Sequence, residues 1–163
     1  RAGLHRPQGV RTPAMDAQET ARACADAMWA EDRASKGLGM EIVSVEPGKA
    51  VLTMTVREDM VNGHAICHGG FMFLLADSAF AFSCNTYNQR TVAQTCTISF
   101  LKPVKLGDRL TATAAERWRE GRSGIYDITV TDQAGTTVAE FRGQSRTIAG
   151  RLLEGTDAQA AGQ

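Results

Sequence analysis

A single carboxylate lies in the middle of the longest apolar segment of the chain. From Phe71 to Cys84 almost every side chain is apolar, and Asp77 is the one acid. A helix that is apolar all round must be buried on all sides, and this segment is shorter than the roughly 20 residues that span a bilayer. Because an unpaired carboxylate in low dielectric is costly, Asp77 is expected either to pair or cap within the fold or to act in a site.

The two residues just before this segment, Gly69 and Gly70, lack side chains. His68-Gly69-Gly70 precedes the expected helix, so backbone N–H groups at the helix start can approach a ligand closely. Those N–H groups lie at the positive end of the helix dipole, where anions bind. An oxyanion-binding helix start and a nearby carboxylate are the groups that acyl transfer to water requires.

The spacing of these groups predicts a site shared between chains. Gly69 and Asp77 are eight residues apart, which on one helix separates their backbones by about 12 Å. A base and an oxyanion donor that act on one carbonyl each lie within about 3 Å of the reacting atoms. The two groups are therefore expected to meet across a two-fold axis between antiparallel central helices.

The remaining pattern predicts an α+β fold with an antiparallel sheet curled around the central helix. A helical period is followed by two period-two segments around a Pro-Gly turn, and four more strands follow the central helix, joined by short turns. Short turns indicate antiparallel neighbours. The expected helix spans residues 16–35, and the expected strands span residues 40–45, 50–56, 91–101, 109–118, 125–131 and 136–147, with a turn at 119–124.

Composition narrows the class of protein. We expect a loose or added arm at residues 1–14, one domain at 15–149 and a flexible tail at 150–163. The formal charge balances to zero, so no global basic field points to nucleic acid or a membrane surface. The four cysteines lie far apart without a CxxC pair, which favours reduced thiols and a cytoplasmic location.

Several of these residues together resemble a known family. Asn62, His68-Gly69-Gly70, Asp77 and the strand that ends in Leu101-Lys102-Pro103 closely resemble the hotdog-fold acyl-CoA thioesterases, within them the phenylacetate-degradation-associated (PaaI-like) subfamily. The resemblance covers residues 37–148. It implies that Asp77 is the general base or nucleophile, that the Gly69 amide is the oxyanion donor, and that Asn62 polarises the carbonyl or orients the substrate. It also implies that Thr95 helps to place the water.

The same resemblance implies the substrate and the assembly. The expected activity is hydrolysis of phenylacetyl- or hydroxyphenylacetyl-CoA to free acid and CoA, by a homotetramer built as a dimer of hotdog dimers, without metal or redox cofactor. Basic and small residues are expected to hold CoA. The candidates are His68 and Gly70 at the helix start, Arg122, Ser123 and Gly124 in the late turn, and Lys102 and Arg119.

Other functions are left open by the residues. His64 and His68 are four apart beside Cys67, but the surrounding glycines indicate a loop and no third ligand follows, so no metal site is expected. Cys67 is expected to be a packed thiol rather than a nucleophile. A hotdog dehydratase would pair His64 or His68 with Asp77, and a non-catalytic acyl-CoA sensor would need no carboxylate; Asn62 and the glycines favour the hydrolase.

Overall fold

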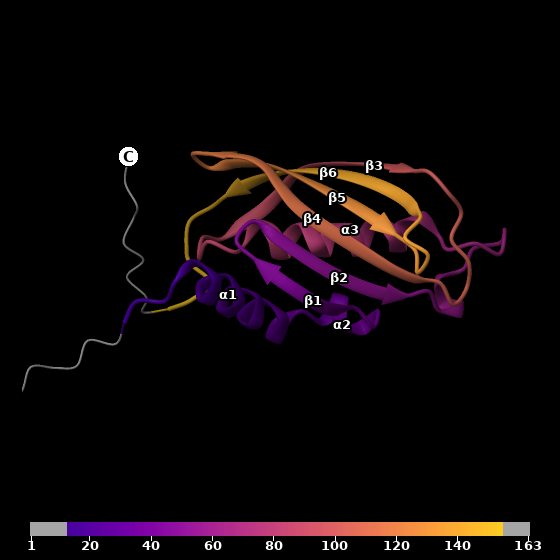
Figure 1. Ribbon diagram of the computed structural model, residues 1–163, viewed down its shortest axis with the longest axis horizontal. Helices are drawn as coiled ribbons and strands as arrows, with labels where there is room; N and C mark the ends of the chain where they lie inside the picture. Colours follow the sequence, from indigo (N-terminus) through magenta and orange to yellow (C-terminus); the bar gives the residue numbers. More distant parts are fainter. Residues whose placement is uncertain (1–12, 155–163) are drawn as a thin grey trace, which may run out of the picture.

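The central helix α3 (Gly69–Cys84) lies against one face of a curved, six-stranded antiparallel sheet (Figure 1). The computed structural model describes residues 13–154. This is the predicted α+β arrangement. The strands are β1 (Glu41–Glu46), β2 (Lys49–Thr55), β4 (Arg109–Glu120), β5 (Ser123–Thr131), β6 (Thr137–Thr147) and β3 (Thr91–Phe100), in that order across the sheet.

The predicted first helix is two helices. α1 (Ala17–Glu31) begins after Asp16, whose carboxylate accepts the Glu19 N–H at 2.7 Å. The chain then leaves helical geometry at Asp32, whose side chain accepts the Ser35 N–H at 2.8 Å and caps α2 (Arg33–Gly37). An N-cap residue has an extended backbone, so the expectation of one continuous helix over residues 16–35 was wrong at Asp32.

The turn between β4 and β5 is shorter than predicted. β4 continues to Glu120 and β5 begins at Ser123, so the connection is only Gly121-Arg122, with Gly121 at φ 57°. A two-residue hairpin of this kind requires positive φ, which glycine adopts without strain. The expected loop over residues 119–124 was therefore wrong, and Ser123 and Gly124 belong to a strand. The other expected strands and the hairpin at Pro47-Gly48 are confirmed within a few residues.

The core lies between α3 and the inner face of the sheet. Alternate residues of β5 are fully buried, as expected for a strand with one solvated face. Gly143 of β6 allows a close approach of α3 to the sheet, because a Cβ there would lie 2.7 Å from the Phe80 ring. The largest buried side chains include Leu52, Leu75, Phe80, Phe82, Leu110, Tyr126, Ile128 and Phe141.

The two edges of the sheet differ. At the β1 edge, α1 runs alongside the strand and Gln18 Nε2 donates to the Val45 carbonyl at 2.8 Å. β3 forms the other edge and is mostly exposed along its length; among the described residues it pairs with β6 alone. Val92 is 45% exposed and Phe100 is 53% exposed. Long exposed edge strands are templates for pairing with another chain.

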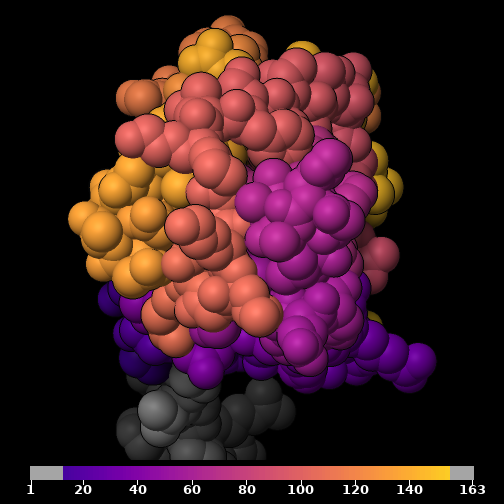
Figure 2. Space-filling view, turned by 90° about the vertical axis from the view of Figure 1, so that its right-hand side faces the viewer, coloured from indigo at the N-terminus to yellow at the C-terminus, as the bar shows by residue number. Residues whose placement is uncertain are grey.

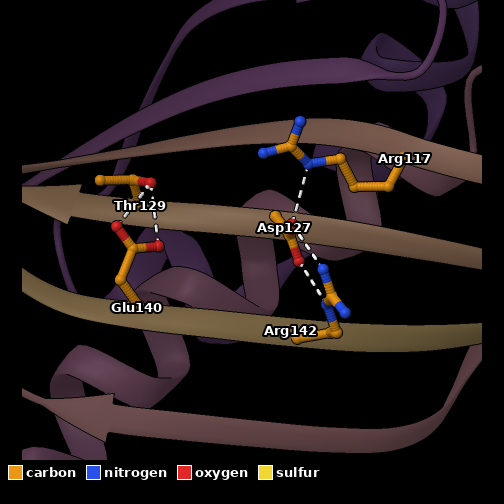
Figure 3. A network of polar contacts seen from close by, with 5 residues as sticks. All are labelled: Arg117, Asp127, Thr129, Glu140 and Arg142. Atoms are coloured by element: carbon orange, nitrogen blue, oxygen red, sulfur yellow. Dashed lines mark hydrogen bonds and ion pairs between the residues drawn. The ribbon is translucent and has the colours of Figure 1, made fainter.

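The outer face of the sheet is polar. Asp127 of β5 accepts hydrogen bonds from Arg142 at 2.6 Å and from Arg117 at 2.8 Å, and Thr129 donates to Glu140 at 3.0 Å (Figure 3). The guanidinium of Arg142, followed by that of Arg117, holds the pKa of Asp127 below its usual value. These charged groups pair with one another on an exposed face of the sheet.

The ends of the chain concern the expected domain boundaries, and the helices concern the expectation that the chain does not span a membrane. Residues 1–12 of the expected arm and residues 155–163 of the expected tail lie outside the described residues, and the division into arm, domain and tail stays a prediction. Within residues 13–154, no helix is long and apolar enough to cross a membrane.

Candidate active site

Asp77 occupies the middle of α3 as a half-buried carboxylate. In residues 13–154 no Lys, Arg or His side chain forms an ion pair with it. Its polar neighbour is the thiol of Cys96 on β3, with Sγ 4.0 Å from Oδ1. Burial raises the pKa of Asp77 above its ordinary value. The structure therefore does not support an ion-paired Asp77; a carboxylate of raised pKa is suited to accepting a proton.

The start of α3 has one unused N–H group. His68 is the N-cap: its Nδ1 accepts the Gly70 N–H at 2.9 Å, and its carbonyl accepts the Phe71 N–H at 3.0 Å. The N–H of Gly69 has no acceptor in residues 13–154. It lies at the positive end of the helix dipole, so it is available to a developing oxyanion.

The loop before the helix fixes the orientation of Asn62. Its side-chain oxygen accepts the N–H of His64 at 2.9 Å and of Ile66 at 3.4 Å. Only the oxygen of an amide can accept these bonds, so the NH₂ group is directed away from the loop, where it has no acceptor in the described part of the chain. Ala65, at φ 60°, completes the tight turn. Asn62 therefore presents a hydrogen-bond donor, a detail that the sequence did not reveal.

Asn62 and Gly69 belong to one end of the molecule. The His68 N–H donates to the Met60 carbonyl at 2.8 Å, which ties the base of the loop to the helix start. The Cys67 N–H donates to Val104 at 2.7 Å, so the loop packs beside the segment after β3 (magenta and salmon in Figure 2). Asp77 lies about 12 Å along the helix from Gly69. Within one chain, these two groups are therefore too far apart to contact the same carbonyl.

Thr95 lies on β3 and forms no hydrogen bond with Asp77 among the described residues. It pairs with Gln144 next to a register shift in β3, and its side chain is exposed. The next residue, Cys96, is the one that touches Asp77. Sequence reasoning missed Cys96, although strand alternation places it on the inner face. The role of Thr95 with water stays a prediction.

The residues expected to hold CoA do not lie close together within one chain. Lys102 N–H donates to the Val138 carbonyl at 3.3 Å near the start of β6, whereas the Arg122 carbonyl accepts the Thr147 N–H at 2.8 Å at its end. The 11 residues of β6 place these ends about 33 Å apart. Two basic residues at opposite ends cannot bind the same phosphate within one chain.

The other candidates near the late turn are partly engaged in the fold. Gly124 is buried, and a Cβ there would lie 2.7 Å from Ser145 Oγ. Ser123 is half-buried at the start of β5. The Arg119 guanidinium lies 3.6 Å from the centre of the Tyr87 ring. Arg122 is exposed, and a role of these residues in CoA binding stays a prediction.

Cys67 has the properties expected of a packed thiol. It is buried, and burial raises its pKa to about 11, so little nucleophilic thiolate exists at neutral pH. Across residues 13–154, His, Cys, Asp and Glu side chains form no group of three or more suited to a metal ion. His64 is exposed in the loop, and His68 serves as the helix cap.

Comparisons with known proteins show which family the chain belongs to. The family model of the thioesterase superfamily matches residues 64–139. The chain is 49% identical over 128 residues to the acyl-coenzyme A thioesterase PaaI of Escherichia coli K12, covering 78% of this chain and 91% of that protein.

Solved structures agree as well. The structure of E. coli PaaI, from the phenylacetic acid degradation operon, matches with a TM-score of 0.82 over 83% of this chain and 99% of that one, at 47% identity. The structure of smu.793 from Streptococcus mutans UA159, bound to acetyl CoA, matches with a TM-score of 0.66 at 27% identity over 69% of this chain and 90% of that one. The chain therefore belongs to the thioesterase superfamily, as a PaaI-like enzyme with the hotdog fold.

Proposed function

We propose that this enzyme hydrolyses acyl-CoA thioesters to free acid and CoA, with aryl-acetyl groups such as phenylacetyl or hydroxyphenylacetyl as its preferred acyl class. The observation that carries the proposal is a pair of separate half-sites, formed by α3 and the loop before it. Two unused donors, Asn62 NH₂ and Gly69 N–H, lie at one end, and an unpaired carboxylate, Asp77, lies about 12 Å away. The name of the E. coli relative supports acyl-CoA as the substrate, and its operon supports the aryl-acetyl group.

The chemistry follows from these groups. The thioester carbonyl accepts hydrogen bonds from the Gly69 N–H and the Asn62 NH₂ as negative charge develops on its oxygen. Asp77 removes a proton from the attacking water, or attacks the carbonyl carbon to form a mixed anhydride that water then cleaves. The CoA thiolate leaves and takes up a proton. A thiolate is a good leaving group, so the reaction proceeds without a metal or redox cofactor in this proposal.

The shared site requires at least a dimer. We propose that two chains pair across the free edge of β3, so that their α3 helices lie antiparallel and Asp77 of one chain faces Gly69 and Asn62 of the other. The exposed side chain of Val92 and the outer edge of β3, which pairs with no other strand among the described residues, support an interface there. Assembly of two such dimers into a tetramer is part of the same proposal.

Release of free CoA thiol from a panel of substrates tests the function. We expect release from phenylacetyl-, hydroxyphenylacetyl-, hexanoyl- and acetyl-CoA, with the highest kcat/KM for the aryl-acetyl pair. Loss of water from 3-hydroxybutyryl-CoA, followed by the absorbance of the enoyl product, serves as the parallel assay for a dehydratase. Absence of thiol release from every substrate would overturn the proposal, and release of equal efficiency from all of them would overturn its aryl-acetyl part.

A further inference from the structure

The inner face of β3 contacts both half-sites of α3. Cys96 lies against Asp77, and the Phe100 ring lies against Gly69. The two strand residues are four apart, a distance of about 13 Å, and the two helix residues are eight apart, about 12 Å. β3 therefore runs antiparallel to α3 and forms a second wall beside the base and the oxyanion donor.

The Phe100 ring packs closely against Gly69. A Cβ on Gly69 would lie 2.8 Å from the tip of the Phe100 ring, closer than real Cβ atoms approach, so a side chain there would push the ring away. Gly69 has no left-handed backbone that would itself demand glycine. The absence of a side chain at Gly69 thus allows the ring to pack against the backbone of the residue that carries the unused N–H group.

The Phe100 ring is not held as a core side chain. It is 53% exposed, whereas Phe80 and Phe82 on α3 are each 1% exposed. An aromatic ring that packs on the helix start with one side and is open on the other offers a flat apolar surface. That surface borders the place where the thioester carbonyl binds in the proposed mechanism.

We infer that Phe100 is a specificity-determining residue, whose ring packs against the aromatic group of a bound aryl-acetyl thioester. In such a substrate one methylene separates the ring from the carbonyl, so a carbonyl held by the Gly69 N–H keeps its ring close to Phe100. Aromatic pairs in offset or edge-to-face contact gain about 2- to 10-fold in binding over burial alone. This inference rests on the proposed function.

Binding of unreactive analogues tests the inference separately from turnover. The thioethers phenethyl-CoA and hexyl-CoA are titrated by calorimetry into the wild type, Phe100→Leu and Phe100→Tyr. We expect Phe100→Leu to reduce the preference for the phenethyl over the hexyl compound by about 5-fold, and Phe100→Tyr to retain it. Leu101→Ala is the matched control, because Leu101 is adjacent and 54% exposed, and it is expected to keep the wild-type preference.

The same variants are then compared in hydrolysis. The ratio of kcat/KM for phenylacetyl-CoA over hexanoyl-CoA is expected to fall about 5-fold in Phe100→Leu and to stay unchanged in Leu101→Ala. An unchanged preference in Phe100→Leu, or an equal loss for aryl and alkyl compounds, would overturn the inference and leave Phe100 a purely structural neighbour of Gly69. Aryl-selective binding without any hydrolysis would instead overturn the proposed function alone.

Discussion

Asp77→Asn is expected to lower kcat for thioester hydrolysis by about 10² or more, because the substitution removes the group that accepts a proton from water or attacks the carbonyl. Asparagine has the same shape and cannot act as a base. The measurement is steady-state thiol release with phenylacetyl-CoA and hexanoyl-CoA. Turnover that stays at the wild-type level would contradict a role of Asp77 either as general base or as nucleophile.

The stability of this variant is the control for its folding. Burial raises the pKa of Asp77 above its unfolded value, so the folded wild type favours the protonated form and loses stability as pH rises through that raised pKa. Asp77→Asn has no charge to bury. Its melting temperature is expected to equal or exceed that of the wild type at pH 7, and the difference is expected to vanish below the unfolded pKa of about 4. A lower melting temperature at pH 7 would mean that the carboxylate stabilises the fold.

Asn62→Asp is expected to lower kcat/KM by about 10² to 10³ with little change in melting temperature. An aspartate oxygen can still accept the two loop N–H groups that Asn62 accepts from His64 and Ile66. The NH₂ donor is lost, however, and an oxygen replaces it near the developing oxyanion. Loss of one oxyanion donor costs a factor of this size in other enzymes.

Asn62→Ala separates the two roles of the side chain. It removes the donor and also the acceptor of the loop hydrogen bonds, so both activity and melting temperature are expected to fall. Wild-type activity in Asn62→Asp would show that the amide serves only to shape the loop. A melting temperature that falls equally in both variants would contradict the assigned orientation of the amide.

The elements that the sequence predicted well are those with a long, regular period. The apolar segment after Gly69 and the alternating strands 91–101 and 136–147 depend on repeated burial, which a pattern records directly. The two errors, at Asp32 and in the β4–β5 turn, concern short segments in which one or two residues decide the local structure. In the first, an aspartate caps a new helix; in the second, a Gly-Arg pair closes a tight hairpin. Both features depend on one or two polar residues among many, so no periodic pattern indicates them.

Some features of the candidate site could be predicted from the sequence and others could not. The spacing of Gly69 and Asp77 was readable because both lie on one helix, and the structure confirms that helix. The direction of the Asn62 amide and the contact of Phe100 with Gly69 were not readable. They depend on a loop hydrogen-bond network and on strand-to-helix packing between residues 31 positions apart, and neither leaves a periodic signal.

The most direct test of a site shared between chains uses two inactive variants together. Asn62→Asp and Asp77→Asn are unfolded, mixed in equal amounts and refolded, and the activity is compared with that of each variant treated alone. Random pairing makes half of the dimers mixed, and each mixed dimer holds one intact site and one that lacks both groups. The account predicts recovery of about one quarter of wild-type activity, as expected for sites that act independently. Activity no higher than that of the separate variants, from a mixture shown to contain mixed dimers, would contradict it.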